Sequence, residues 1–294
     1  MPRTQLFGHL AMLTLSFLVA GSFSLGSTIA NLVPPDALTA LRFSAGAILV
    51  GSIAIFTSKL KFEHFIGGWR FIFLGGLFSV FFVTMFEALK ITQPVSTSAV
   101  FTLAPPLTAI FSYLILRQVS TKRISIALAI GAVGALWVIF RADLAAFLSF
   151  NIGKGEAIFF IGVAAHALYT PLFRKLSKGE PVIVSTFGVM VGGAIVLWAL
   201  SFNNIATTNW VNLPVSFWLV FIYLVVAASS LTFFLLQFAA LRLPSAKVMA
   251  YTYLIPSWVI FWEFAKGNGL PSINILVGIA ITTISLILLL KNEN

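Results

Sequence analysis

Residues 77–86 read LFSVFFVTMF, and the only polar side chains in this run are Ser79 and Thr84. The strands of a membrane β-barrel alternate apolar and polar residues, and this run does not alternate. It belongs to a stretch without charged residues from 71 to 86. A helix needs about 20 mostly apolar residues to cross the hydrocarbon core. With a few flanking residues, the stretch therefore predicts a membrane-spanning helix.

The rest of the chain has the same character. Of its 294 residues, 60% are hydrophobic and 9% are charged, and the mean hydropathy is +1.04. A soluble domain carries roughly 25% charged residues, so this composition excludes a water-soluble globule. The chain has no cysteine, which excludes a disulfide scaffold, a thiolate metal site and a cysteine nucleophile.

Stretches without Asp, Glu, Lys or Arg predict ten transmembrane helices. Residues 181–241 are too many for one helix and contain a polar interruption at 203–212, so this stretch is predicted as two. The other eight predicted spans, which take in flanking residues where the stretch is short, are 10–30, 43–58, 71–86, 91–116, 124–140, 157–173, 248–262 and 272–290. The expected fold class is all-α, a polytopic membrane protein embedded in the lipid bilayer.

The net charge of +10 is more typical of basic cytoplasmic loops than of nucleic-acid binding, and no nucleic-acid partner is expected. With a cytoplasmic N-terminus, ten spans place 13 Lys and Arg residues inside and 4 outside, with Arg42 within the second span. The inner set is Arg3, Lys59, Lys61, Arg70, Arg117, Lys122, Arg123, Arg174, Lys175, Lys178, Arg242, Lys247 and Lys291, and the outer set is Lys90, Arg141, Lys154 and Lys266. This bias predicts a cell inner (plasma) membrane protein with both termini cytoplasmic. The alternative, a cleaved signal peptide in the first span, is weaker because no polar mature N-terminus follows.

The second half of the chain resembles the first. The sequence ALKI at 88–91, followed by FTLAP at 101–105, parallels ALRL at 240–243 followed by TYLIP at 252–256. Each half, 1–141 and 153–294, contains five predicted spans, and an odd number makes the two copies enter the membrane from opposite sides. Such inverted repeats enclose a substrate site near the midplane. Chance similarity between Leu-, Ala- and Phe-rich helices is the alternative interpretation.

The Ala88-Leu89-Lys90 step, the midhelix Pro105, the Leu41-Arg42-Phe43 sequence and the five-plus-five layout together resemble the EamA-type transporters of the drug/metabolite transporter superfamily. The resemblance covers essentially the whole chain, and YddG-like amino-acid exporters are the nearest branch. It implies ten helices, two inverted five-helix repeats around a central cavity, and export of small metabolites.

The fourth predicted helix has a polar stripe at helical spacing that includes Ser98, Thr102 and Pro105. Its counterparts in the second half, 151 residues later, include Tyr253 and Pro256. We expect the two stripes to flank the cavity, with Ser98, Thr102 and Tyr253 binding substrate and the two prolines serving as hinges. Packing contacts between helices are the alternative role for small and polar residues.

Three further rings complete the predicted substrate site: His166 and Tyr169 on the sixth predicted helix, and Trp258 on the ninth. His166 is the one midspan group that titrates near neutral pH without a large perturbation, although a hydrogen bond to a neighbouring helix would also explain it. The three histidines are scattered and no carboxylates cluster with them, so no metal site is expected.

Charged side chains inside a membrane are costly and usually functional, and the candidates are Arg42, Glu87 and Glu263. Arg42 either fixes helix packing or binds a substrate carboxylate. Glu87 lies three residues before Lys90, so it forms a surface pair or has a gating or proton-transfer role.

The sequence lacks a nucleotide-binding loop, a dinucleotide fingerprint and a zinc-protease motif, so we expect neither an enzyme nor a cofactor. The predicted function is secondary or facilitative export of small metabolites, chiefly amino acids, by alternating access in a monomer. Export of drugs or other amphiphiles is the alternative. A non-transporting membrane subunit and an intramembrane enzyme are the alternatives from other classes.

Overall fold

The computed structural model describes residues 3–57, 60–119, 121–140, 143 and 152–290, and these contain helices and no strand. The α-helices are α1 (Arg3–Ser27), α2 (Pro35–Phe56), α3 (Trp69–Leu89), α4 (Pro94–Phe101), α5 (Ala104–Leu116), α6 (Lys122–Ile139), α8 (Lys154–Leu176), α9 (Val182–Thr207), α10 (Val215–Val225), α11 (Thr232–Ala240), α12 (Ser245–Ala250), α13 (Ile255–Ala265) and α14 (Ile273–Leu290). Three short elements are η1 (Phe62–Phe65) and η3 (Tyr251–Leu254), which are 3₁₀ turns, and η2 (Val226–Leu231), which is a π-helix.

The prediction of an all-helical, multi-pass membrane protein is confirmed. Over the described residues, nine helical segments are long and apolar enough to cross a membrane. The run expected as the ninth span consists of α12, η3 and α13 in direct succession. Positions 1, 58, 141 and 291–294, which bound predicted spans or halves, lie outside the described residues, as do Lys59, Arg141 and Lys291 of the charge count.

The second span begins at Pro35 and contains Asp36 near its start and Arg42 further in, as predicted. One predicted boundary was wrong. The helix α9 continues to Thr207, through part of the polar stretch predicted to interrupt it. Side-chain polarity alone did not end either helix.

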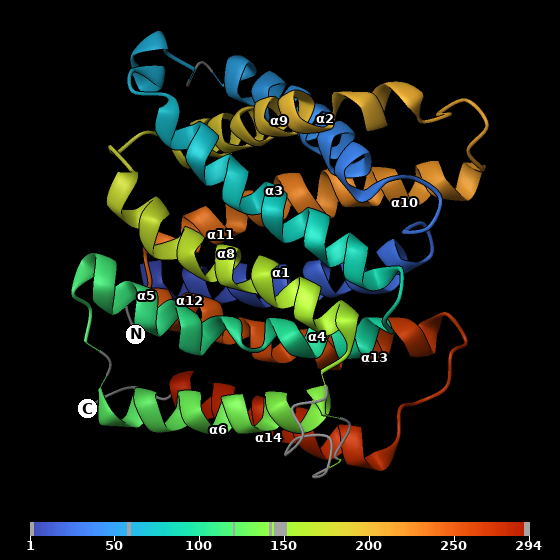
Figure 1. Ribbon diagram of the computed structural model, residues 1–294. Helices are drawn as coiled ribbons and strands as arrows, with labels where there is room; N and C mark the ends of the chain where they lie inside the picture. The colour runs from blue at the N-terminus through green and yellow to red at the C-terminus, as the bar shows by residue number, and fades with distance from the viewer. Residues whose placement is uncertain (1–2, 58–59, 120, 141–142, 144–151, 291–294) are drawn as a thin grey trace.

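The helices form a bundle in which segments distant in sequence lie side by side (Figure 1). Helix α2 packs along α9, α3 lies between α8 and α9, and α6 packs along α14. Helix α1 begins and α14 ends at the same end of the bundle, which we call the terminal end, while α3 ends and α8 begins at the opposite end.

Two of these helix pairs approach through glycine. A Cβ atom on Gly75 of α3 would collide with the backbone of α9 around Gly192 and Gly193. Likewise, a Cβ atom on Gly134 of α6 would lie 2.8 Å from the carbonyl oxygen of Gly278 in α14. Since lipid is as apolar as the helix surfaces, close backbone approach and van der Waals contact replace the hydrophobic effect as the source of helix association.

Helix breaks precede both predicted hinge prolines. Helix α4 ends and α5 begins around Thr102 and Leu103, directly before Pro105. The 3₁₀ turn η3 directly precedes Pro256. Proline has no N–H to donate to the carbonyl four residues earlier and its ring displaces that carbonyl, so the breaks have a local cause in the sequence.

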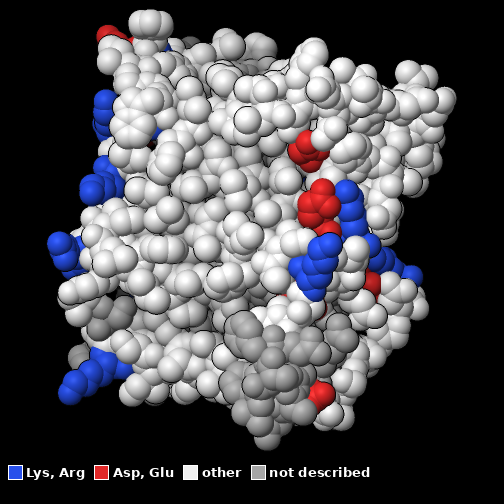
Figure 2. Space-filling view, viewed as in Figure 1, with Lys and Arg blue, Asp and Glu red and all other residues white. Residues whose placement is uncertain are grey.

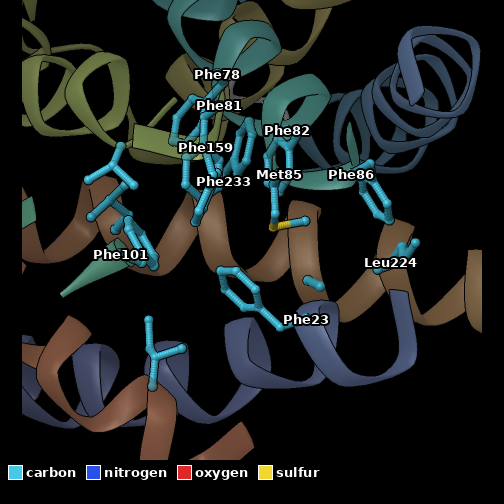
Figure 3. Close-up of a cluster of buried hydrophobic side chains, with 14 of the residues drawn as sticks. Phe23, Phe78, Phe81, Phe82, Met85, Phe86, Phe101, Phe159, Leu224 and Phe233 are labelled. Atoms are coloured by element: carbon cyan, nitrogen blue, oxygen red, sulfur yellow. The ribbon is translucent and has the colours of Figure 1, made fainter. Parts of the chain in front are cut away.

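Aromatic side chains fill the middle of the bundle (Figure 3). The labelled members are Phe23, Phe78, Phe81, Phe82, Met85, Phe86, Phe101, Phe159, Leu224 and Phe233. Phe78 stacks on Phe233 with 4.0 Å between ring centroids, and Phe81 lies 5.0 Å from Phe101 and 5.5 Å from Phe159. Such ring pairs add roughly 0.5–1.5 kcal/mol each beyond area burial, so the aromatic cluster holds five helices together.

Candidate functional site

A small central space lies among the aromatic rings. Its lining residues are Met12, Leu15, Val19, Phe78, Phe81, Phe82, Phe101, His166, Phe233, Leu236, Met249 and Thr252. Its volume is about 20 Å³, which is little more than the roughly 10–15 Å³ that a cavity needs to hold one water molecule. The structure therefore shows the centre closed, with too little room for an organic solute.

His166 is the predicted site residue that borders this space. Its imidazole lies between the rings of Phe78, Phe81 and Phe101, with centroid distances of 5.3, 4.6 and 4.9 Å. Among the described residues, Nδ1 has no hydrogen-bond partner. The imidazole is thus a polar group within an aromatic shell.

Tyr169 lies one turn along α8 and is connected to two residues that sequence reasoning missed. Its hydroxyl oxygen accepts a hydrogen bond of 2.9 Å from Nε2 of Gln237, whose Oε1 accepts one of 3.2 Å from Thr186. The Tyr169 ring lies 4.2 Å from that of Phe78. Gln237 is the single amide in the apolar run 215–240, a signal that could have identified it. The three polar groups form a network directly behind the aromatic lining.

The structure does not bring Tyr253 and Trp258 together with His166. The Tyr253 hydroxyl points to the carbonyl of Leu128 on α6, at 3.4 Å. Trp258 donates from Nε1 to the Ser16 hydroxyl at 3.2 Å. Thr252, the residue before Tyr253 in the 3₁₀ turn η3, lines the central space.

Ser98 and Thr102 are fully buried in α4 and beside its end. Their hydroxyls donate to carbonyl oxygens of the same helix, Ser98 to Val95 at 2.8 Å and Thr102 to Ala99 at 2.6 Å. This back-bonding within a helix often accompanies bending. In this closed form the two hydroxyls support the break before Pro105.

Arg42 is fully buried in α2 and is held by uncharged groups. Its Nε donates to the hydroxyl of Ser229, and its Nη2 donates to the carbonyl of Ala228 at 2.7 Å. The guanidinium lies 4.0 Å from the centroid of the Phe82 ring, a cation–π contact. The π-helix η2 supplies both hydrogen-bond partners, and sequence reasoning did not anticipate it.

A buried ion pair joins the loops at the terminal end. Nη1 of Arg70, in the first turn of α3, lies 2.7 Å from Oε1 of Glu180, and the two side chains are 4% and 3% exposed. Arg70 also donates to the carbonyls of Leu176 and His64, each at 2.9 Å. Because Glu180 precedes α9, the pair fastens α3 to the α8–α9 connection.

The opposite end is hollowed in two places. One hollow of about 460 Å³ includes Asp36 and Glu87 in its lining, and a second of about 800 Å³ includes Glu263 and Lys266. Acidic and basic side chains appear together here, whereas Lys and Arg predominate at the left-hand, terminal end (Figure 2).

The two predicted acidic candidates at this end are both paired. Glu87 forms an exposed pair with Lys90 at 3.2 Å. Glu263 pairs with Lys266 at 2.8 Å and accepts hydrogen bonds from Ser24 and Asn268. Within the described ranges, no three His, Asp or Glu side chains are grouped as metal ligands.

Comparisons with known proteins agree with this architecture. The sequence profile of the EamA-like transporter family matches residues 6–140 and 153–291. The chain is 26% identical over 272 residues to an uncharacterized transporter, YyaM, of Bacillus subtilis (strain 168), covering 91% of this chain and 88% of that protein. A solved crystal structure of a protein 19% identical in sequence has the same fold, with a TM-score of 0.70 over 97% of this chain and 95% of that one. The chain therefore belongs to the EamA-like transporter family and is a membrane transporter.

Proposed function

We propose that this transporter is a secondary or facilitative exporter of small metabolites, chiefly amino acids, that works by alternating access. The supporting observations are a nearly closed aromatic space at the centre and two hollows at the opposite end, with the buried Arg70–Glu180 pair joining loops at the terminal end. Passage then requires the aromatic centre to open toward each side in turn.

We further propose ten membrane crossings arranged as two inverted repeats, 1–141 and 153–294, in a monomer. The α12–η3–α13 run would be the tenth crossing. The pairings of α2 with α9 and of α6 with α14 support the repeats, because each joins helices at equivalent places in the two halves. The breaks before Pro105 and Pro256 support the same correspondence.

Amino acids suit the centre because apolar rings can contact a side chain while few polar groups meet the backbone charges. The polar groups nearby are His166, Thr252 and the Tyr169–Gln237 pair. The same rings favour amphiphilic drugs as the second candidate. Purified protein in proteoliposomes, given radiolabelled amino acids and cationic dyes, tests the choice. Transport of dyes but not of amino acids would contradict the main proposal. If neither class is transported, both candidate functions are wrong.

The proposed orientation places the terminal end in the cytoplasm. The chain has no cysteine, so single cysteines report their location without background. Val119 lies between α5 and α6 and Val211 between α9 and α10, and they are 79% and 91% exposed. We expect an impermeant maleimide to label Val211→Cys in intact cells and Val119→Cys only after lysis. The reverse pattern would overturn the orientation.

Alternating access also makes a prediction for the two prolines. Replacing Pro105 or Pro256 with alanine restores an N–H and should leave folding intact. A straighter, stiffer helix should slow the opening of one side, so we expect transport to fall about tenfold while substrate binding persists. Proteoliposome flux and ligand-induced thermal stabilisation measure the two effects. Normal flux in both variants would contradict the hinge role.

A further inference from the structure

Arg42 is a positive charge at depth in the bundle. It lies seven residues into α2 from Pro35, which is about 10 Å along the axis at 1.5 Å per residue. Its side chain is fully buried. A charged group at such a depth normally has an opposite charge or a water-filled cavity beside it.

The acidic residues on α2 and α3 have other partners. Asp36, on the same helix, accepts hydrogen bonds from Nδ2 of Asn204 and from the backbone N–H of Ala37. Glu87, on α3, pairs with Lys90. Among the described residues, no carboxylate forms an ion pair with Arg42, and its Nη1 has no hydrogen-bond partner.

Hydrogen bonds from two of its nitrogen atoms nevertheless fix the orientation of this guanidinium. The Ser229 hydroxyl donates to the carbonyl of Leu224 at 2.8 Å, so its oxygen is left to accept from Nε of Arg42. The carbonyl of Ala228 accepts from Nη2. Both partners lie in the π-helix η2, a type of element frequent at functional sites. The result is a fixed guanidinium with one NH₂ group, Nη1, unpartnered.

The ring of Phe82 contacts both this guanidinium and the central space. Phe82 lines the central space, and the guanidinium of Arg42 lies over its ring. One turn further along α3, Phe86 is 6.0 Å from the guanidinium, and Val83 and Glu87 line the 460 Å³ hollow. Arg42 therefore lies between the central space and one hollow of the opposite end.

Building on the proposed transport function, we propose that Arg42 is the anion-binding group of the substrate site and selects solutes that bear a carboxylate. Phe82 covers the guanidinium while the centre is closed. When the centre opens, the ring moves aside and the carboxylate takes the unpartnered Nη1. Because a charged hydrogen bond replaces a cation–π contact, the solute carboxylate favours the open centre.

Matched solutes test the proposal on the unmodified protein. The probes are L-leucine and L-phenylalanine, their amides, which lack the carboxylate, and 4-methylpentanoate and 3-phenylpropionate, which lack the amine. We expect the carboxylates to stabilise the purified protein against heat and to be transported, with the amides weaker by roughly 10- to 100-fold. Equal binding of amides and carboxylates would overturn the assignment.

Substitutions at Arg42 test whether this residue causes the preference for carboxylates. Arg42→Met should remove the preference for carboxylates, and Arg42→Lys should keep part of it, since lysine retains the charge without the planar fork. Arg242→Met is the matched control, because Arg242 is exposed and its guanidinium interacts with Phe238 in the preceding helix α11. A carboxylate preference that persists in Arg42→Met would overturn the assignment. If Arg42→Met does not fold, the comparison of amides with carboxylates decides.

The outcomes also separate this proposal from the transport function. Flux of amides or dyes without a carboxylate preference would leave a working transporter and exclude Arg42 as its anion site. Carboxylate binding that depends on Arg42, with no flux of any probe, would establish the site and contradict export of these solutes. Neither binding nor flux of any probe would overturn both.

Discussion

Replacing Gly75 with alanine is expected to destabilise the folded transporter strongly. The new Cβ atom would meet the backbone of Val189, Gly192 and Gly193 in α9. Side chains can rotate away from an added methyl group at about 1–3 kcal/mol, but here α3 and α9 must separate along the contact. We expect a loss of at least 3 kcal/mol, or roughly 6–12 °C in the melting temperature, and Gly75→Leu should yield no folded protein.

The neighbouring Gly76 provides the control. A Cβ atom there would approach only Val196, at 3.9 Å, an ordinary contact distance. Both substitutions gain the same helix propensity over glycine, so their difference isolates the contact with α9. Thermal melting of the purified variants in detergent measures it. Equal melting temperatures for Gly75→Ala and Gly76→Ala would show that α3 and α9 do not approach this closely.

The second large effect is expected from breaking the Arg70–Glu180 pair. Removing one member of a buried ion pair leaves an uncompensated charge and costs about 3–5 kcal/mol. We therefore expect Arg70→Met and Glu180→Leu each to weaken the terminal end. The double variant should recover most of the loss, because apolar replacement of both partners is often neutral. Melting temperatures give the total effect.

Accessibility shows where that effect arises. Met12 lines the central space and is fully buried, so Met12→Cys should react with an impermeant maleimide from the terminal end faster in the single variants than in the double one. Glu87→Ala is the control, since the exposed Glu87–Lys90 pair is worth at most about 1 kcal/mol. Unchanged reactivity in all variants would mean that the pair does not close this end.

The sequence predicts the helical segments well because a run of about 20 consecutive apolar residues is typical of a membrane-spanning helix and of few other structures. Its error lies where polar residues continue a helix, as in α9 beyond residue 203. The buried Arg70–Glu180 pair was missed for a related reason. Both residues lie at helix ends, where a sequence gives no indication that two loops will meet.

The candidate site was predictable only in part. Regular helix geometry predicts that His166 and Tyr169 lie one turn apart, and in the continuous helix α8 both contact Phe78 of α3. It does not predict η3, which contains the lining residue Thr252, nor η2, which contains the partners of Arg42. Residues in a 3₁₀ turn or a π-helix depart from the 100° repeat, and the proline that causes one of these irregularities does not specify its geometry. The adjacent Ser229 and Ser230 in an otherwise apolar run were the available hint of η2.

The closed aromatic centre also has a thermal consequence. Opening it to a watery passage transfers ring surface into water, and apolar exposure raises the heat capacity. The free-energy difference between the closed and open centre therefore curves with temperature instead of changing linearly. Because the stabilisation from apolar burial weakens on cooling, the contribution of the rings to the stability of the closed centre falls at low temperature. Temperature thus acts on this protein through the equilibrium between its conformations as well as through the rate at which they interconvert.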